Sequence, residues 1–373
     1  MFLHLSRKKQ LLFAAAAAGF SLFFALFMAE LLLNFQRSRI QKSSHFDPGM
    51  VLYDEILGWK MAPGWQGGHR HYDFQVTYST NPYGFRGVFN PPGIAAGKRY
   101  AFVGDSFTFS YGVNDHETFI YQLGAWDKKT AAYMNFGVPG YSTDQEYLLI
   151  KQRVFFFLPD VIFLVVYLGN DLFDNALPFP LQAQHAKPYF ELTSEGLVLR
   201  NTPVPRETKP ASQAQKDLQH AVFGDRALNR GLPDRYLGRF QLYQVLRQRF
   251  GARPDSSGYF TAQFKNSLGL FFAIIEQTRR ECVQKNTRLA LVLMPGKSFV
   301  ELPGSLSAQF QDYLRQKIVE NRDKMKVEVL DLAGHLRSRY GKTPGRWFYP
   351  NEGHLTSQGH RVVAEFLRPQ ISR

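Results

Sequence analysis

Cysteine is almost absent from this 373-residue chain, in which Cys282 is the single example. One cysteine cannot form an intramolecular disulfide, so a small secreted fold held together by disulfides is excluded, as is a metal site built from cysteines. Cys282 lies in a segment with the pattern of a helix, where we interpret it as a small packed residue rather than a nucleophile. We expect no cofactor and no bound metal.

Clustered metal-ligating residues are also scarce. His69 and His71 are two positions apart and would share one face of a strand. A metal site needs more ligands than these two side chains provide. We therefore predict that this pair belongs to a solvated loop.

Acidic residues are outnumbered, with 31 Asp and Glu against 45 Lys and Arg, which gives a net charge of +14. Such a charge suits a nucleic acid, an anionic lipid surface or an acidic polymer. The basic residues are scattered rather than gathered into a stripe, and no nucleic-acid-binding motif is present, so we expect no nucleic-acid partner. Proximity to a membrane accounts for the charge with fewer assumptions.

A long apolar run lies close to the N-terminus. Residues 11–29 carry no charge and consist mainly of Leu, Phe and Ala, and residues 31–33 extend the run. At a rise of about 1.5 Å per residue, a helix of this length approaches the thickness of a bilayer core. Glu30 lies near the far end, where its side chain can reach the interface. The length and the position favour one membrane-spanning helix over a buried core helix.

The membrane helix is predicted to remain as an anchor. A cleavable signal peptide has a shorter apolar core and a small-x-small cleavage site, and no Ala-x-Ala pattern follows this run. Basic residues flank both ends almost equally, with Arg7, Lys8 and Lys9 before the run and Arg37, Arg39 and Lys42 after it. A short N-terminal tail usually stays cytoplasmic. We therefore expect the body of the protein on the extracytoplasmic, periplasmic side.

The chain divides into three predicted regions. Residues 1–36 form the anchor, and residues 37–97 form a segment rich in Pro, Gly and aromatic residues, which we call the lead-in segment. Residues 98–373 form the main domain, interrupted at about 172–235 by a Pro-, Gln- and Arg-rich insertion that we expect to cover or shape a site. One hairpin, at 189–199, is readable inside this insertion.

Strand and helix patterns alternate along the main domain. Apolar strands are predicted at 100–103, 132–136, 160–167, 289–294 and 327–332, with helices at 117–126, 143–157, 238–250, 261–284, 307–325 and 357–367. The 143–157 helix is predicted to begin with a capping box, with Thr143 as N-cap and Glu146 at the third helical position. This alternation predicts an α/β fold, a three-layer α/β/α sandwich with a mainly parallel sheet.

Polar clusters follow three of the predicted strands. They are Gly104-Asp105-Ser106, the glycines at 137 and 140, and Gly169-Asn170-Asp171. In an open parallel sheet the functional site lies at the carboxyl ends of the strands. His354 precedes the last helix and can face the same edge.

A serine that attacks an ester needs a base, a group that orients the base, and donors for the oxyanion. Ser106 supplies a candidate nucleophile and His354 a candidate base. The side-chain amide of Asn170 and the backbone N–H of Gly140 are suitable oxyanion donors.

Four sequence blocks, in this order, resemble the GDSL-type esterases and acyltransferases known as SGNH hydrolases. The blocks are Gly104-Asp-Ser-Phe107, Asn135-Phe-Gly-Val-Pro-Gly-Tyr-Ser142, Gly169-Asn-Asp171 and Asn351-Glu-Gly-His-Leu-Thr-Ser-Gln-Gly-His360. The resemblance covers roughly residue 98 to the end. It implies an SGNH-like fold, Ser106 as nucleophile and His354 as base. It also implies an oxyanion hole made by the Ser106 N–H, Gly140 and Asn170.

The last block departs from the family pattern, which often reads Asp-x-x-His. Asn351 stands at the Asp position and cannot carry a negative charge. Some members place the acid two residues before the histidine, where this chain has Glu352, and we predict Glu352 as the orienting acid. Asn351 as a neutral orienting group, or a backbone carbonyl, is the alternative. We expect Asp105 to brace its turn and Asp171 to fix the loop that holds Asn170.

These residues predict a serine-dependent enzyme that acts on ester bonds through an acyl-enzyme. Water as acceptor gives an esterase, whereas a sugar hydroxyl gives an O-acyltransferase acting on carbohydrate or lipid esters at the cell envelope. The alternative is a weakly active or inactive module that binds glycan or a partner protein, which the Asn at position 351 favours. His360 is expected to pack or cap the last helix.

Overall fold

The computed structural model describes residues 7–87, 97–127, 131–181, 183–208, 237, 240–250, 257–342 and 345–371. Its centre is a five-stranded parallel sheet with the strand order β12-β11-β8-β6-β7. The strands are β6 (Arg99–Gly104), β7 (Ala132–Gly137), β8 (Val161–Tyr167), β11 (Arg288–Met294) and β12 (Glu328–Leu330). The central strands β6, β8 and β11 are almost wholly buried, as strands covered on both faces must be.

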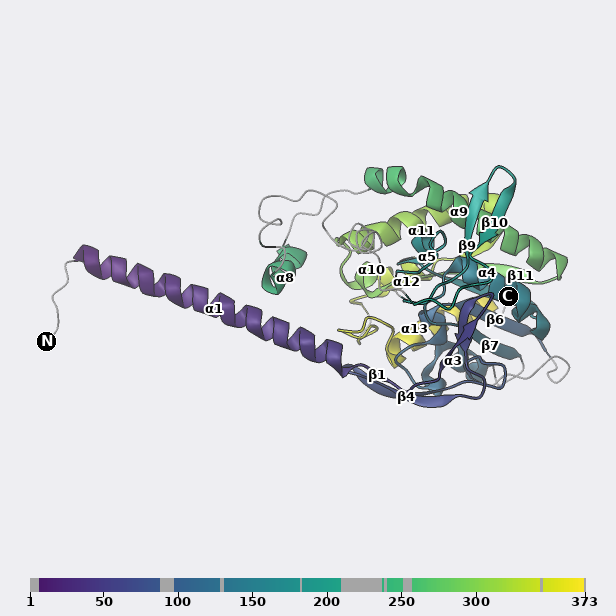
Figure 1. The fold of residues 1–373 in the computed structure, drawn as a ribbon, viewed down its shortest axis with the longest axis horizontal. Coiled ribbons are helices and arrows are strands. Elements are labelled where there is room, and N and C mark those ends of the chain that lie inside the picture. Colours follow the sequence, from purple (N-terminus) through teal and green to yellow (C-terminus); the bar gives the residue numbers. More distant parts are fainter. Residues whose placement is uncertain are drawn as a thin grey trace.

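Helices cover both faces of this sheet (Figure 1). One group packs together from α4 (Thr143–Gln152), α9 (Ser257–Gln284) and α11 (Leu306–Met325). The other consists of α3 (Phe119–Trp126), α12 (Leu332–Arg339) and α13 (Ser357–Ile371). The predicted three-layer α/β/α fold is therefore confirmed. The carboxyl ends of β6, β7 and β8 are neighbours, so the three predicted polar clusters share one edge.

The N-terminal helix α1 runs from Arg7 to Ser43 and projects away from the body (Figure 1). It is long and apolar enough to cross a membrane, and none of its most apolar window is buried. Length and composition of this kind suit a membrane span or a signal sequence. Glu30, near the end of the apolar run, accepts hydrogen bonds from the backbone N–H groups of Gln241 (2.8 Å) and Leu242 (2.9 Å). It thereby caps α8 (Gln241–Phe250).

The lead-in segment folds into two small antiparallel sheets. One contains β1 (His45–Phe46), β4 (Gln66–His71) and β5 (Phe74–Ser79), and the other contains β2 (Val51–Asp54) and β3 (Gly58–Met61). The prediction of a solvated loop at the two histidines is wrong for His69, which lies in β4 with 2% of its surface exposed. Its Nδ1 lies 2.9 Å from the hydroxyl of Tyr78, so a neighbouring strand provides the polar partner.

The predicted capping box at the start of α4 is wrong. Ser142 is the N-cap residue, and its side chain makes no capping hydrogen bond. The Thr143 hydroxyl donates to Asn175 Oδ1 at 2.9 Å, and both carboxylate oxygens of Glu146 are buried without a partner among the described residues. Tertiary burial has replaced the local capping pattern. The helix also ends at Gln152, and a 3₁₀ turn, Val154–Phe157, follows it.

Several short elements were not predicted. They are α2 (Ser106–Phe109), α5 (Asp171–Asp174), α10 (Lys297–Glu301), α12 and a 3₁₀ turn at Asp115–Glu117. The insertion contains the predicted hairpin, as β9 (Tyr189–Thr193) and β10 (Gly196–Arg200). Residues 182 and 209–235 of the insertion lie outside the described residues.

Two predicted packing roles agree with the structure. Cys282 is buried in α9, and burial raises the pKa of its thiol to about 12, which leaves it protonated and unreactive. His360 is buried in α13, with its ring stacked on Phe119 at a centroid distance of 5.9 Å.

Candidate active site

Ser106 lies where β6 turns into a very short helix. Gly104 ends the strand, and a Cβ at this position would lie 2.2 Å from Thr108 Oγ1, so the close approach requires glycine. Asp105 is the N-cap, and its Oδ1 accepts a hydrogen bond from Phe107 N at 2.9 Å. Asp105 therefore braces the turn, as predicted. Ser106 begins α2, where a backbone N–H has no intrahelical acceptor and can serve a bound oxyanion.

The structure brings Ser106, His354 and Glu352 into one hydrogen-bonded chain. Ser106 Oγ lies 2.7 Å from His354 Nε2, although the two residues are 248 positions apart. On the other side of the ring, His354 Nδ1 lies 2.6 Å from Glu352 Oε1. The second oxygen, Oε2, accepts a hydrogen bond from His354 N at 2.9 Å. A serine nucleophile, its base and an orienting acid require an arrangement of this kind.

Asn351, the alternative orienting residue, points elsewhere. Its side-chain amide donates to Asp73 Oδ1 at 2.7 Å, and its backbone N–H donates to Asp73 Oδ2 at 2.8 Å. Glu352 is thus the residue that reaches the imidazole. Both residues lie in a tight loop that Tyr349 N closes by donating to His354 O at 2.8 Å. Gly353 has a φ of 96°, a conformation that favours glycine, and it allows Glu352 to fold back onto the histidine.

The pair of Glu352 and His354 shifts the pKa of each partner in opposite directions. Burial opposes the positive charge on His354, but the hydrogen-bonded Glu352 and the further carboxylate of Asp105 outweigh it, so the pKa of His354 is raised. Burial also opposes the negative charge on Glu352, but His354 and then His71 outweigh it, so the pKa of Glu352 is lowered. His354 is therefore more basic than a free imidazole, and Glu352 is more acidic than a free glutamate.

Aromatic rings enclose the imidazole. The ring centroid of His354 lies 4.5 Å from that of Phe107 and 5.3 Å from that of Tyr111. Tyr167 stacks on Phe107 at 4.5 Å. These rings pack against the imidazole, which leaves 18% of the His354 side chain exposed.

The two predicted oxyanion donors beyond Ser106 occupy loops at the same sheet edge. Gly140 follows β7 with a φ of 84°, and a Cβ there would lie 3.2 Å from the Trp59 ring. Asn170 follows β8 and is 1% exposed. Its Nδ2 donates to Asp174 Oδ2 at 2.9 Å, which leaves the second N–H of the amide for another acceptor. Asp171 Oδ2 accepts from Tyr167 N at 2.9 Å and fixes this loop, as predicted.

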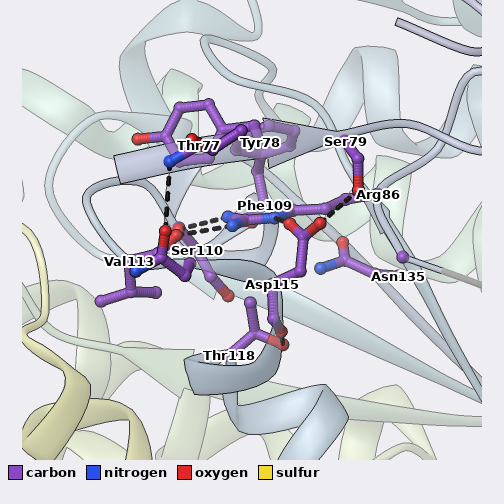
Figure 2. A network of polar contacts seen from close by, with 12 residues as sticks. Thr77, Tyr78, Ser79, Arg86, Phe109, Ser110, Val113, Asp115, Thr118 and Asn135 are labelled. Carbon is purple, nitrogen blue, oxygen red and sulfur yellow. Dashed lines mark hydrogen bonds and ion pairs between the residues drawn. The ribbon is translucent and has the colours of Figure 1, made fainter. Parts of the chain in front are cut away.

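A buried arginine that the sequence did not single out supports the nucleophile helix (Figure 2). Arg86, from the lead-in segment, is 1% exposed. Its guanidinium donates to the carbonyl oxygens of Phe109 (2.7 Å), Ser110 (2.5 Å) and Val113 (2.6 Å) and to Asp115 Oδ1 (2.8 Å). These acceptors include carbonyls at the end of α2, which a helix of one turn leaves without internal partners.

Carboxyl groups gather beneath the site. Glu146, Asp105 and Asp171 are buried. Burial, and then the mutual repulsion of the negative charges, raise the pKa of Glu146 and of Asp171 well above the ordinary value. Burial likewise raises the pKa of Asp105 to about 6. No group of three or more described residues is arranged to hold a metal ion.

Solved structures similar to this chain are titled as esterases and lipases. An acetylxylan esterase from Geobacillus stearothermophilus, a catalytic mutant, is 9% identical, with 74% of this chain and 95% of that chain covered and a TM-score of 0.42. A lipase/acylhydrolase from Enterococcus faecalis is 13% identical, with 74% and 95% covered and a TM-score of 0.38. A member of the lipolytic protein G-D-S-L family from Veillonella parvula is 13% identical, with 74% and 100% covered and a TM-score of 0.39.

No protein-family model and no curated protein matches the chain. The resemblance to GDSL-type esterases and acyltransferases rests on the four sequence blocks. At these identities and TM-scores the likeness assigns no activity to this chain. The case for a function rests on the geometry of Ser106, His354 and Glu352.

Proposed function

We propose that the protein is a serine-dependent ester hydrolase or O-acyltransferase that works through an acyl-enzyme at Ser106. The observation that carries this proposal is the unbroken chain from Ser106 Oγ to His354 Nε2 (2.7 Å) and from His354 Nδ1 to Glu352 Oε1 (2.6 Å). A serine hydroxyl is a weak nucleophile until a base removes its proton, and this geometry supplies the base and its orienting acid.

In the first half-reaction, Ser106 Oγ attacks the carbonyl carbon of the ester while His354 Nε2 takes the hydroxyl proton. The oxyanion that develops is held by the Ser106 N–H, the Gly140 N–H and the Asn170 amide. When the C–O bond to the alcohol breaks, His354 returns the proton to the leaving oxygen. The acyl group remains on Ser106, and Glu352 stabilises the imidazolium throughout.

In the second half-reaction, His354 removes a proton from the acceptor hydroxyl, whose oxygen attacks the acyl carbon. The bond between that carbon and Ser106 Oγ then breaks, and His354 returns the proton to Ser106 Oγ. Water as acceptor gives hydrolysis, and a sugar hydroxyl gives transfer. We propose an acylated carbohydrate or lipid of the cell envelope as substrate, with the catalytic body on the extracytoplasmic face. The apolar helix α1 and the net charge of +14 support a position at a membrane.

The direct test is the hydrolysis of p-nitrophenyl acetate by the full-length chain in detergent, compared with Ser106→Ala. We expect nitrophenol release that Ser106→Ala abolishes. An oligosaccharide added as a second acceptor distinguishes the two outcomes of the second half-reaction, because transfer yields an acetylated sugar. Equal release by both chains would refute the enzyme and favour a glycan- or protein-binding module.

A further inference from the structure

The turn between β4 and β5 reaches the loop that carries the candidate acid and base. Asp73 lies in this turn and accepts three hydrogen bonds from that loop, 278 and 279 positions away in sequence. Its Oδ2 accepts from Asn351 N at 2.8 Å and from Glu352 N at 2.9 Å. Its Oδ1 accepts from the side-chain amide of Asn351 at 2.7 Å. Asp73 thus holds the main chain of Glu352 itself.

The turn that presents Asp73 is itself fixed. Asp73 N donates to His71 Nδ1 at 3.2 Å. The ring of Phe74 lies 5.0 Å from that of Tyr349, the first residue of the loop 349–354, which we call the catalytic loop. The Tyr349 hydroxyl donates to Gly112 O at 2.9 Å, three residues beyond the end of α2, the helix that begins with Ser106. The first residue of the loop is therefore fixed both by the β4–β5 turn and by the segment that follows α2.

The charge of Asp73 suits this position. Two backbone N–H groups and one amide N–H converge on it, and a carboxylate can accept all three whereas no neutral side chain of equal size accepts at both ends. A movement of Glu352 by about 1 Å would misalign the imidazole, and misplacement of this size costs about a hundredfold in rate.

We propose that Asp73 is a positioning residue for the reaction, one that sets the place of Glu352 and His354 without touching the substrate. This inference rests on the proposed function. It also explains Asn351: the residue that departs from the family pattern donates its amide to an acid supplied by the lead-in segment.

The test is a set of variants of the full-length chain assayed for Ser106-dependent ester hydrolysis. Asp73→Ala is expected to lower kcat about tenfold or more and to leave KM within about threefold. It is also expected to move the acidic limb of the pH profile to lower pH, because a displaced Glu352 no longer raises the pKa of His354. A variant that is only partly unfolded would have a lower kcat at every pH, and the acidic limb of its pH profile would stay at the same pH.

The pair of Asp73 and Asn351 provides a sharper readout. Asn351→Asp places two carboxylates face to face, and we expect it to cost about tenfold in kcat and to lower Tm. In the Asp73→Asn background, Asn351→Asp exchanges the two partners. The amide introduced at position 73 then donates to the carboxylate introduced at position 351. There Asn351→Asp should cost less than about twofold.

Asp47 is the matched control, because it lies in the same segment and accepts from Gly68 N at 2.6 Å rather than from the catalytic loop. Asp47→Ala should leave kcat and the pH profile unchanged. Wild-type kinetics in Asp73→Ala, or an equal cost of Asn351→Asp in both backgrounds, would overturn the positioning role alone. Absence of Ser106-dependent turnover in the unaltered chain would overturn the proposed function and this role together.

Discussion

The lead-in segment and the insertion both lack the strand–helix alternation of the main domain, but they contact different parts of the molecule. The lead-in segment precedes the main domain, and the insertion interrupts it. The lead-in segment contacts the catalytic loops directly, through Arg86 at the nucleophile helix and Asp73 at the histidine loop. The described part of the insertion packs its hairpin on α9 and α4, in the outer helix layer. It reaches the candidate site at Asn170, where Asp174 Oδ2 accepts from the side-chain amide and Phe173 N donates to the carbonyl oxygen.

In the lead-in segment, the buried side chain of Arg86 and the partly buried side chain of Asp73 make the connections to the candidate active site. The Trp59 indole also donates to Pro139 O at 3.0 Å, next to Gly140. The lead-in segment therefore touches three of the four motif loops. A hydrogen bond to a main-chain group fixes a loop without constraining its side chains, which leaves those free for chemistry.

Arg86→Ala is expected to have the largest effect on stability. It leaves three carbonyl oxygens and Asp115 without their buried partner, and the loss of one member of such a network costs about 3–5 kcal/mol. The free energy of unfolding, measured by denaturant titration, checks this. Ser106 should also lose its reactivity as α2 loosens. A change below about 1 kcal/mol would show that the lead-in segment is dispensable.

Glu352→Gln tests the loop that the lead-in segment holds. It should lower kcat about a thousandfold, because the imidazolium loses its counter-charge while the geometry is kept. Since Glu352 raises the pKa of His354, and His354 must be neutral to act as a base, activity appears only as pH rises through that pKa. The variant lowers the pKa, so its acidic limb should shift to lower pH in a pH–rate profile. Asn351→Ala is the control and should shift that limb less.

Glu146→Gln tests the helix beneath the insertion. Lys187 from the insertion pairs with Asp144, but both oxygens of Glu146 are buried without a described partner. Burial raises the pKa of Glu146, so this residue opposes folding increasingly as pH rises above the ordinary carboxyl range. The neutral variant should be more stable by about 1–3 kcal/mol near neutral pH, with less gain in acid. Thermal unfolding at several pH values measures this difference in stability between the two chains. A less stable Glu146→Gln variant would show that the carboxylate of Glu146 does not oppose folding.

Arg200→Ala should have the smallest effect. Arg200 pairs with Glu191 across the hairpin of the insertion at 2.8 Å, and both side chains are almost half exposed. Exposed pairs contribute about 0.5 kcal/mol or less. The same arginine-to-alanine change that damages the lead-in segment should leave both Tm and ester hydrolysis nearly unchanged here. An effect comparable to that of Arg86→Ala would remove the contrast between the two regions.

The sequence predicts the sheet well because its buried strands are nearly continuous apolar runs, such as residues 160–167, which are apolar after Asp160. Runs of this length and composition are typical of strands covered on both faces. It also predicts that Ser106, Asn170 and His354 share an edge, because strand ends in a parallel sheet converge. The capping box at Thr143 failed because Glu146 is buried by distant elements. Arg86 and Asp73 could not be found, since their partners lie far along the chain and only the fold brings them together.

The most direct measurement of the central claim is covalent labelling of the full-length chain with a fluorophosphonate, followed by peptide mass spectrometry. A serine activated by His354 and Glu352 attacks this reagent, whereas an ordinary surface serine does not. The account predicts one adduct, on Ser106, which forms far more slowly in Glu352→Gln and is absent in His354→Ala. Labelling of another serine, or equal labelling in all three chains, would contradict it.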